Sequence, residues 1–185
     1  MSLPDAEALY TTLFQKILPD SRKYAALVGI HTGGAWLAKR LHRDLVATHT
    51  GNSPEFVQQS GMLSVSFHRD DFDKIGLHAQ KKSSEIPFPV DGAHILLIDD
   101  VLQSGRTIRA AINELFDYGR PASISLAVLV DRGNRELPIC AQYIGATLSL
   151  PNEKTLELNH DDHGKFYLSM ENKNGADTNH RGAFT

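Results

Sequence analysis

The sequence predicts an α/β fold in which helices flank a central, mainly parallel sheet. Short apolar runs alternate with segments whose apolar residues recur at helical spacing, an alternation typical of strands joined by crossover helices. The runs at 24–30, 94–98 and 123–130 are almost continuously apolar, as expected of parallel strands buried on both faces. Polar or glycine residues follow each run, and ligands bind at the carboxyl ends of strands in such sheets.

The first half of the chain supplies two predicted helices and two predicted strands. Residues 5–18 place their apolar side chains on one helical face, between prolines suited to a helix start and a helix end. A buried strand is expected over 24–30 and a helix over 35–45. Alternating apolar residues over 62–67 predict a half-buried strand.

Residues 68–86 are charged and lack periodicity, which predicts a flexible functional loop. A strand over 94–98 comes next, followed by a helix that starts near Ile108 and ends at Gly119. A strand over 123–130 and weaker strand candidates at 142–144 and 156–158 complete the elements. The prediction is one domain over residues 1–170 and a mobile polar tail over 171–185.

Composition narrows the class of protein. The chain has 185 residues, 41% of them hydrophobic and 22% charged, which suits a globular domain with one substantial core. Its net charge of −3 gives no overall attraction to nucleic acid. The lone Cys140 excludes an intrachain disulfide and is interpreted as a small buried hydrophobe. With no leader-like start and no apolar run near ~18 residues, we expect a cytoplasmic protein.

The segment 95–107 carries the strongest functional signal. Four apolar residues lead to Asp99 and Asp100 at the predicted strand exit, and a loop with hydroxyls and a glycine then opens a helix. Backbone N–H groups at a helix start bind anions, Gly105 allows close approach to a phosphate, and Ser104 and Thr107 offer hydroxyl donors. Adjacent acids on a regular strand face opposite ways, so they suit a polyhydroxyl ligand or hydrated Mg²⁺ better than acid–base catalysis. Neither a dinucleotide glycine motif nor a Walker lysine is present.

This segment resembles the phosphoribosyl pyrophosphate (PRPP) motif of type I phosphoribosyltransferases, with Ser104 where threonine is more usual. Further segments, collinear over about residues 24–150, are similar to one subfamily: 28–41, 67–71, 117–123, 129–139 and 143–145. That subfamily, of the PyrR type, combines pyrimidine-operon attenuation with uracil phosphoribosyltransferase activity. The resemblance implies the type I phosphoribosyltransferase fold with a flexible hood loop. It also implies conversion of uracil and PRPP to uridine monophosphate (UMP) and pyrophosphate, with Mg²⁺, by a homo-oligomer.

The resemblance also assigns residues. The pyrophosphate loop would contain His31, Thr32, Gly33 and Gly34, and Arg69 would lie near the hood. Asp99 and Asp100 would be the catalytic carboxylates, which hold the ribose hydroxyls and bind Mg²⁺ through water. The rest of the PRPP site would be Val101, Leu102, Gln103, Ser104, Gly105, Arg106 and Thr107. Val130, Asp131 and Arg132 would lie beside uracil, which related enzymes read largely through backbone groups. Carboxylates and Mg²⁺ would stabilise the charge separation between ribose and diphosphate.

Two other functions remain open: an RNA-binding attenuator, and a salvage enzyme for another base. Residues 31–34 read His-Thr-Gly-Gly where attenuators usually carry Lys-Thr-Arg-Gly, and Asn134 stands where RNA-binding relatives usually place histidine. RNA affinity depends on basic contacts, and the basic cluster is small: Lys39, Arg40, Arg43, Arg132 and Arg135. We therefore expect weak binding of leader RNA. The His160–His163 segment is interpreted as a solvated loop, because it lacks further metal ligands nearby.

Overall fold

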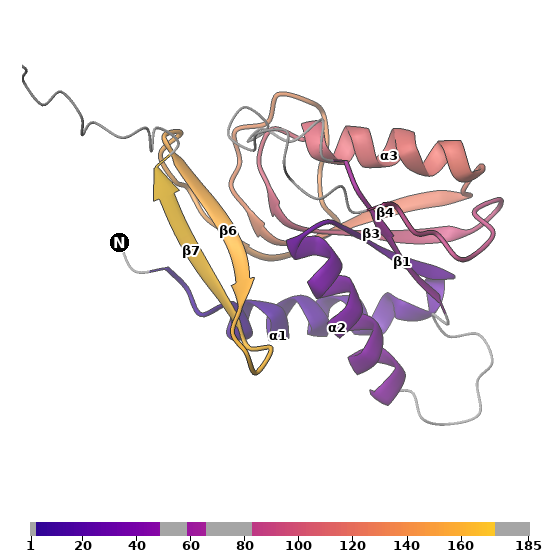
Figure 1. The fold of residues 1–185 in the computed structure, drawn as a ribbon, viewed down its shortest axis with the longest axis horizontal. Coiled ribbons are helices and arrows are strands. Elements are labelled where there is room, and N and C mark those ends of the chain that lie inside the picture. The colour runs from indigo at the N-terminus through magenta and orange to yellow at the C-terminus, as the bar shows by residue number, and fades with distance from the viewer. Residues whose placement is uncertain (1–2, 49–58, 66–82, 173–185) are drawn as a thin grey trace, which may run out of the picture.

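A computed structural model describes residues 3–48, 59–65 and 83–172 of the chain (Figure 1). The elements in chain order are α1 (Ala6–Ile17), a 3₁₀ turn (Leu18–Lys23), β1 (Ala26–Ile30), α2 (Gly33–Thr48), β2 (Gln59–Leu63), β3 (His94–Leu102), α3 (Arg106–Tyr118), β4 (Ser123–Asp131), β5 (Tyr143–Thr147), β6 (Lys154–His160) and β7 (Phe166–Asn172).

The sheet is parallel throughout its described strands. Its order is β2-β1-β3-β4-β5, and each neighbouring pair runs in the same direction. The helices α1 and α2 lie on one face and α3 on the other (Figure 1). Leu96 and Ile98 of β3 pack into the core on the α1–α2 side, whereas Ile95 and Leu97 pack on the α3 side. The predicted α/β fold with a mainly parallel sheet is confirmed.

Each helix forms where its apolar residues can meet the sheet. In α1, Ala6, Tyr10, Leu13 and Ile17 recur at three- and four-residue intervals and are all buried. The side chain of Asp5 accepts a hydrogen bond from the backbone N–H of Glu7 and so caps the start of this helix. On the opposite face of the sheet, α3 ends before Gly119, whose φ of 155° suits a glycine.

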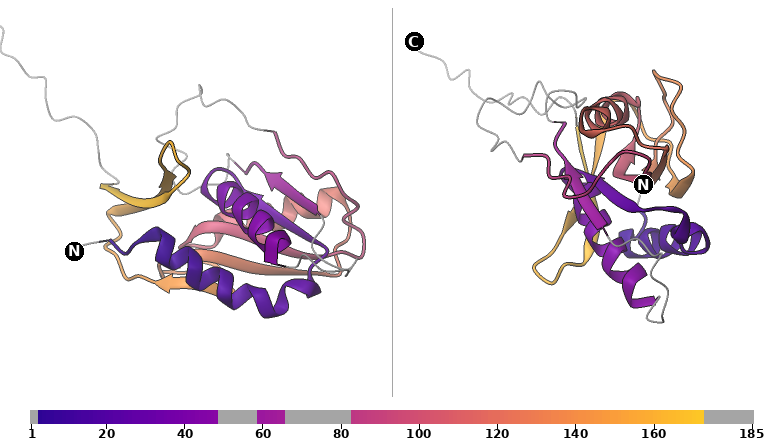
Figure 2. Two further views of the ribbon diagram at one scale, coloured as in Figure 1. Left: turned by 90° about the horizontal axis from the view of Figure 1, so that it is seen from below. Right: turned by 90° about the vertical axis from the view of Figure 1, so that its right-hand side faces the viewer.

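A charged contact joins the hairpin β6–β7 to both helices of its face. The guanidinium of Arg40 on α2 donates to both carboxylate oxygens of Glu7 on α1, at 2.7 Å each. It also lies 4.2 Å from the centre of the Tyr10 ring and 4.9 Å from that of Phe166. The backbone N–H of Phe166 donates to Glu7 at 2.6 Å. Figure 2 shows the result, with the hairpin held at one end of the sheet beside the start of α1.

Several predicted boundaries are wrong. The strand β3 continues to Leu102, because Asp99 still pairs with Val128 and Leu102 with Asp131; the two acids therefore lie within the strand rather than at its exit. The strand β2 spans Gln59–Leu63 instead of beginning at 62. Glu171 and Asn172, assigned to a tail, belong to β7, a strand that the sequence analysis did not predict.

Other sequence predictions have mixed outcomes. Cys140 is exposed, not buried, because it lies in the loop before β5. Most of the predicted flexible loop and residues 173–185 of the predicted tail lie outside the described residues. The end of that loop packs against β2, where Glu85 pairs with Met62 and Ser84 accepts from the N–H of Ser64. Among the helices of the described ranges, none is long and apolar enough to cross a membrane.

We predict that Glu7→Gln destabilises the fold, because it weakens a half-buried bidentate ion pair and the hold on β7. Hydrogen bonds to charged groups contribute about 1.5–3 kcal/mol and exposed pairs about 0.2–1 kcal/mol, so we expect a loss of about 1–2 kcal/mol at pH 7. Urea unfolding measures it. The exposed Glu153→Gln variant is the matched control, with a change expected within about 0.5 kcal/mol.

The same comparison has a defined pH dependence. The hydrogen bond from Arg40 holds the pKa of Glu7 below its usual value, although burial opposes the shift. A lowered pKa in the folded state means that the contribution is complete above the unfolded-state value of about 4.3 and is lost as the pH falls through the folded-state value. The gap in stability between wild type and Glu7→Gln should therefore shrink in acid. A gap that is absent at pH 7, or that widens below pH 4, would contradict the assigned interaction.

Candidate active site

In the parallel sheet, the three strand ends predicted to bind ligand lie side by side at the carboxyl ends of the strands. The loop at 31–34 follows β1 and opens α2, the loop at 103–105 follows β3 and opens α3, and residues 132–135 follow β4. Since β1, β3 and β4 are parallel neighbours, their carboxyl ends lie side by side. All predicted site residues except Arg69 fall in this region, and Arg69 lies outside the described residues.

The two carboxylates at this edge are buried. Asp99 is 5% exposed and Asp100 is 8% exposed. One oxygen of Asp99 accepts the backbone N–H of Asp100 at 3.0 Å. One oxygen of Asp100 accepts the backbone N–H of Leu158 in β6 at 3.3 Å. Burying a carboxylate is costly unless hydrogen bonds or an opposite charge compensate for the lost water. These backbone hydrogen bonds supply part of that compensation, and a ligand that donates hydrogen bonds or carries positive charge would supply the rest.

Close glycine packing fixes the acids against the start of α2. A Cβ added at Gly34 would lie 2.5 Å from the carbonyl oxygen of Ile98 and 2.9 Å from the Cα of Asp99. A Cβ at Gly33 would lie 2.6 Å from the Asp100 Cγ and would overlap its Oδ2. The sequence resemblance places both glycines in the pyrophosphate loop. The structure shows that Gly34 is also required for the approach of α2 to β3, because a side chain there would meet strand backbone, whereas one at Gly33 would meet only the Asp100 side chain.

The loop between β3 and α3 forms an open helix start. Gly105 precedes α3 with a φ of 91°, and no side chain caps the first turn from that position. The hydroxyl of Ser104 accepts from the N–H of Arg106 at 3.2 Å, and the Ser104 carbonyl accepts from the N–H groups of Glu136 and Leu137. The loop is therefore held from behind by residues 136–137, and the first-turn N–H groups with the helix dipole form an anion site.

Three predicted PRPP-site side chains point elsewhere. Leu102 is 1% exposed and packs into the core, and Val101 packs against the core on the opposite side of the sheet. Arg106 forms an exposed ion pair with Glu136 at 2.5 Å. Contacts of Val101 and Leu102 with a ligand would have to be made by their backbone atoms.

The predicted base-binding segment is rigidly supported. Val130 is fully buried, so it can face a base only through its backbone. The carboxylate of Asp131 pairs with Arg135 at 2.5 Å and accepts the N–H of Gly133 at 2.8 Å. Arg135 also donates to the carbonyls of Gln103 at 2.8 Å and Ile139 at 2.9 Å. Arg135 therefore clamps the phosphate loop onto the segment after β4.

The carboxylates of Asp99 and Asp100 suit Mg²⁺ only when a bound substrate supplies further oxygen ligands. Within the described ranges, no group of three His, Cys, Asp or Glu side chains could hold a metal ion. Asp99 and Asp100 offer hard oxygen ligands, and Mg²⁺ commonly binds one or two carboxylates together with water and substrate phosphate oxygens. The pair fits that arrangement. The His160–His163 segment forms a turn in which Asp161 accepts from the backbone N–H groups of His163 and Lys165.

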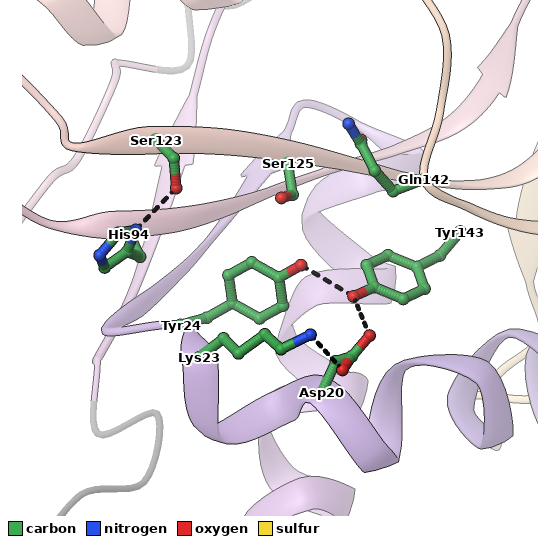
Figure 3. Close-up of a pocket in the computed structure, with 8 residues that line it drawn as sticks. All are labelled: Asp20, Lys23, Tyr24, His94, Ser123, Ser125, Gln142 and Tyr143. Carbon is green, nitrogen blue, oxygen red and sulfur yellow. Dashed lines mark hydrogen bonds and ion pairs between the residues drawn. The ribbon is translucent and has the colours of Figure 1, made fainter.

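A pocket of about 610 Å³ lies at the opposite end of the strands, where β3, β4 and β5 begin (Figure 3). Its polar groups bond to one another: the Tyr24 and Tyr143 hydroxyls lie 2.9 Å apart, and Tyr143 donates to Asp20 at 2.9 Å. His94 and Ser123 form a further pair at 2.8 Å. Its lining contains none of the predicted site residues, and its position opposite the acid pair separates it from the candidate active site.

Backbone contacts that the sequence analysis missed complete the site. The N–H of Leu158, 58 positions after Asp100, reaches that carboxylate, and the carbonyl of Pro151 accepts from Arg132 at 3.1 Å. Neither contact depends on a side-chain type at its position, so residue patterns carry no signal for it.

We predict that Gly33→Ala impairs turnover by displacing the Asp100 carboxylate. A misplacement of about 1 Å can cost about 100-fold in rate, so we expect a loss of about 10- to 100-fold in kcat/KM for the phosphoribosyl transfer that the sequence resemblance implies. The matched control is Gly92→Ala. Gly92 has a φ of 71° and nothing within 4 Å of an added Cβ, so that variant carries backbone strain away from the site. Full activity in a folded Gly33→Ala protein would show that Asp100 need not stay where the structure places it.

Comparison with known proteins agrees with this geometry. The family model for the phosphoribosyl transferase domain matches residues 2–154. The protein named bifunctional protein PyrR of Ralstonia nicotianae is 48% identical over 176 residues, which cover 91% of this chain and 95% of the relative. That of Nitrosococcus oceani is 49% identical over 147 residues, 79% of each chain. That of Pseudomonas aeruginosa is 48% identical and covers 85% of this chain and 90% of the relative.

Solved structures agree at the level of the fold. A Trypanosoma cruzi hypoxanthine phosphoribosyl transferase structure has a TM-score of 0.59 and 20% identity, covering 80% of this chain and 77% of that one. A hypoxanthine-guanine phosphoribosyltransferase from Bacillus anthracis has a TM-score of 0.57 and 17% identity, covering 80% and 83%. The fold, the glycine-packed acid pair and the extent of the sequence similarity lead to one conclusion: this chain belongs to the phosphoribosyltransferase family and, within it, to the PyrR type.

Proposed function

We propose that this protein transfers the phosphoribosyl group of PRPP to uracil, giving UMP and pyrophosphate. The observation that carries the proposal is the buried pair Asp99–Asp100, packed against the glycine start of α2 and followed by the open start of α3. Two helix starts for phosphate groups and two carboxylates for a sugar between them match the chemistry of PRPP.

The residues act by holding and stabilising the reacting sugar. Asp99 and Asp100 accept hydrogen bonds from the ribose hydroxyls and stabilise the positive charge that develops at the anomeric carbon as the bond to diphosphate breaks. The electron pair of the broken bond leaves with diphosphate, uracil N1 forms the new bond to that carbon, and the N1 proton passes to the departing diphosphate or to water. The backbone N–H groups of Gly33–Gly34 and of the first turn of α3 bind the phosphate groups at either end.

The acid pair also suits Mg²⁺, which Asp99 and Asp100 would hold through water. When bound, that ion neutralises negative charge on the leaving diphosphate. For the base, the buried Val130 and the paired Asp131 favour recognition through the backbone at the end of β4. A homo-oligomeric state and a cytoplasmic location stay predictions from the sequence.

The function is tested with purified protein, PRPP and Mg²⁺, and uracil, hypoxanthine, guanine and orotate in parallel. We expect UMP formation with uracil and little product with the other bases. Removal of one transition-state stabiliser costs about 10²–10³-fold, so Asp99→Asn with Asp100→Asn should reduce turnover by at least that factor. Circular dichroism should show an intact fold. Preferential turnover of a purine, or undiminished activity in the folded double variant, would refute the proposal.

The relatives are named bifunctional, so regulation through RNA is a candidate second function beside phosphoribosyl transfer. Most cations of the basic cluster are not available to RNA. Arg40 pairs with Glu7, Arg132 is buried, and Arg135 is bound to Asp131 and to backbone carbonyls. Arg43, 70% exposed but paired with Asp44, and the exposed Lys39 remain. We propose that leader RNA binds weakly, because few of these cations can reach a phosphate without losing a partner.

A titration with pyrimidine-leader RNA at two salt concentrations, with and without UMP, checks this proposal. We expect affinities near the non-specific range of about 10⁻⁶–10⁻⁴ M and a shallow salt slope, because about one counterion is released per phosphate contact. An unrelated RNA of equal length is the control. Nanomolar, leader-specific binding with a steep salt slope would establish attenuation as a leading function instead.

A further inference from the structure

Arg132 is a buried cation without a matching anion in the described part of the chain. It is 4% exposed and lies just after β4, beside the loop that joins β3 to α3. Its Nη1 donates to the side-chain oxygen of Gln103 at 3.1 Å, and its Nη2 donates to the carbonyl of Pro151 at 3.1 Å. Its Nε is buried and has no hydrogen-bond partner in the described part of the chain. No described carboxylate forms an ion pair with it.

Two other described arginines whose side chains are largely buried are each paired with a carboxylate. Arg135, three positions later, pairs with Asp131 at 2.5 Å, and Arg40 forms a bidentate pair with Glu7. Burial lowers the pKa of the Arg132 guanidinium, with no opposing carboxylate to raise it, yet arginine stays protonated in proteins. A buried charge is costly unless it is paired. A charge left unmatched among the described residues is therefore a reason to look for an anionic ligand.

The hydrogen bond from Arg132 fixes the orientation of the Gln103 side-chain amide. A guanidinium has only donors, so the Gln103 amide must turn its oxygen toward Arg132. The two N–H donors of the same amide then face away from Arg132, and no described group accepts from them. Gln103 is partly exposed and lies three residues before the start of α3 and its anion site.

We propose that Arg132 is a positioning residue that orients Gln103 to donate to the 5′-phosphate shared by PRPP and UMP, and that the phosphate complements the buried charge. This inference rests on the proposed function, because it names how that site recognises its phosphorylated ligand. In the low dielectric of the interior, the fixed charge of Arg132 strengthens phosphate binding at the loop, and it adds to the α3 dipole. The sequence resemblance placed Arg132 beside the base; its contacts favour the phosphate loop.

The test compares binding of UMP with binding of uridine, which lacks the phosphate, by isothermal titration calorimetry. Charge-assisted contacts are about twice as strong as neutral ones, so Arg132→Gln should weaken UMP binding about 10- to 100-fold and leave uridine binding unchanged. Arg132→Lys keeps the charge and should recover most of the loss. In turnover, KM for PRPP should rise more than kcat falls, because the phosphate lies away from the reacting bond. The exposed Arg43→Gln is the matched control.

A second variant keeps the test independent of whether Arg132 is needed for folding. Gln103→Glu supplies a carboxylate to Arg132, so unliganded protein should become more stable to urea while UMP binding weakens at least about tenfold. If wild-type protein does not prefer UMP to uridine, the proposed function and this inference both fail. If wild type prefers UMP, and both Arg132→Gln and Gln103→Glu keep that preference, only the inference is overturned.

Discussion

The site depends on the backbone of α2 lying directly on β1 and β3. Gly29 and Gly34 leave no room for a Cβ between helix and strand, and an added methyl at Gly29 would lie 2.5 Å from the carbonyl oxygen of Gly34. This contact places the start of α2 beside Asp99 and Asp100, so the anion-binding end of one helix and the two acids share a single location. A side chain at these positions would move the helix away from the strand and separate the groups that the reaction requires.

A second layer of support comes from parts of the chain far from the motif. The segment after β4 holds the phosphate loop through Arg135 and through two backbone bonds to Ser104. The hairpin β6–β7 reaches Asp100 through the N–H of Leu158, and the Glu7–Arg40 pair fixes that hairpin to α1 and α2. The charged contact is 24% exposed at each side chain. Its main structural effect is to align elements that converge on the acid pair, which preorganises the site.

The arginines illustrate how tertiary context decides the role of a charge. On sequence grounds, Arg40, Arg132 and Arg135 belonged to a small basic cluster from which only weak RNA binding was expected. In the structure, Arg40 stabilises the packing of the helices and Arg135 braces a loop, and Arg132 alone is buried without a carboxylate among the described residues. Residue type gives the sign of the charge, but only the partners determine whether it is available to a ligand.

The sequence by itself determined the class of fold, the order of most elements and the location of the site. Apolar runs such as 94–98 and helical spacing such as that of α1 report burial directly, and the run of acids, hydroxyls and glycine after β3 is a local pattern. Only the tertiary structure decided that β3 extends past its acids, that Glu171 and Asn172 lie in a strand, and that Leu158 meets Asp100. Those outcomes depend on backbone pairing between residues distant in the chain, and a backbone N–H is the same for nearly every residue type. Likewise, the sequence resemblance placed Gly34 in the pyrophosphate loop, but only the packing of α2 on β3 showed that a side chain there would meet the backbone of Ile98 and Asp99.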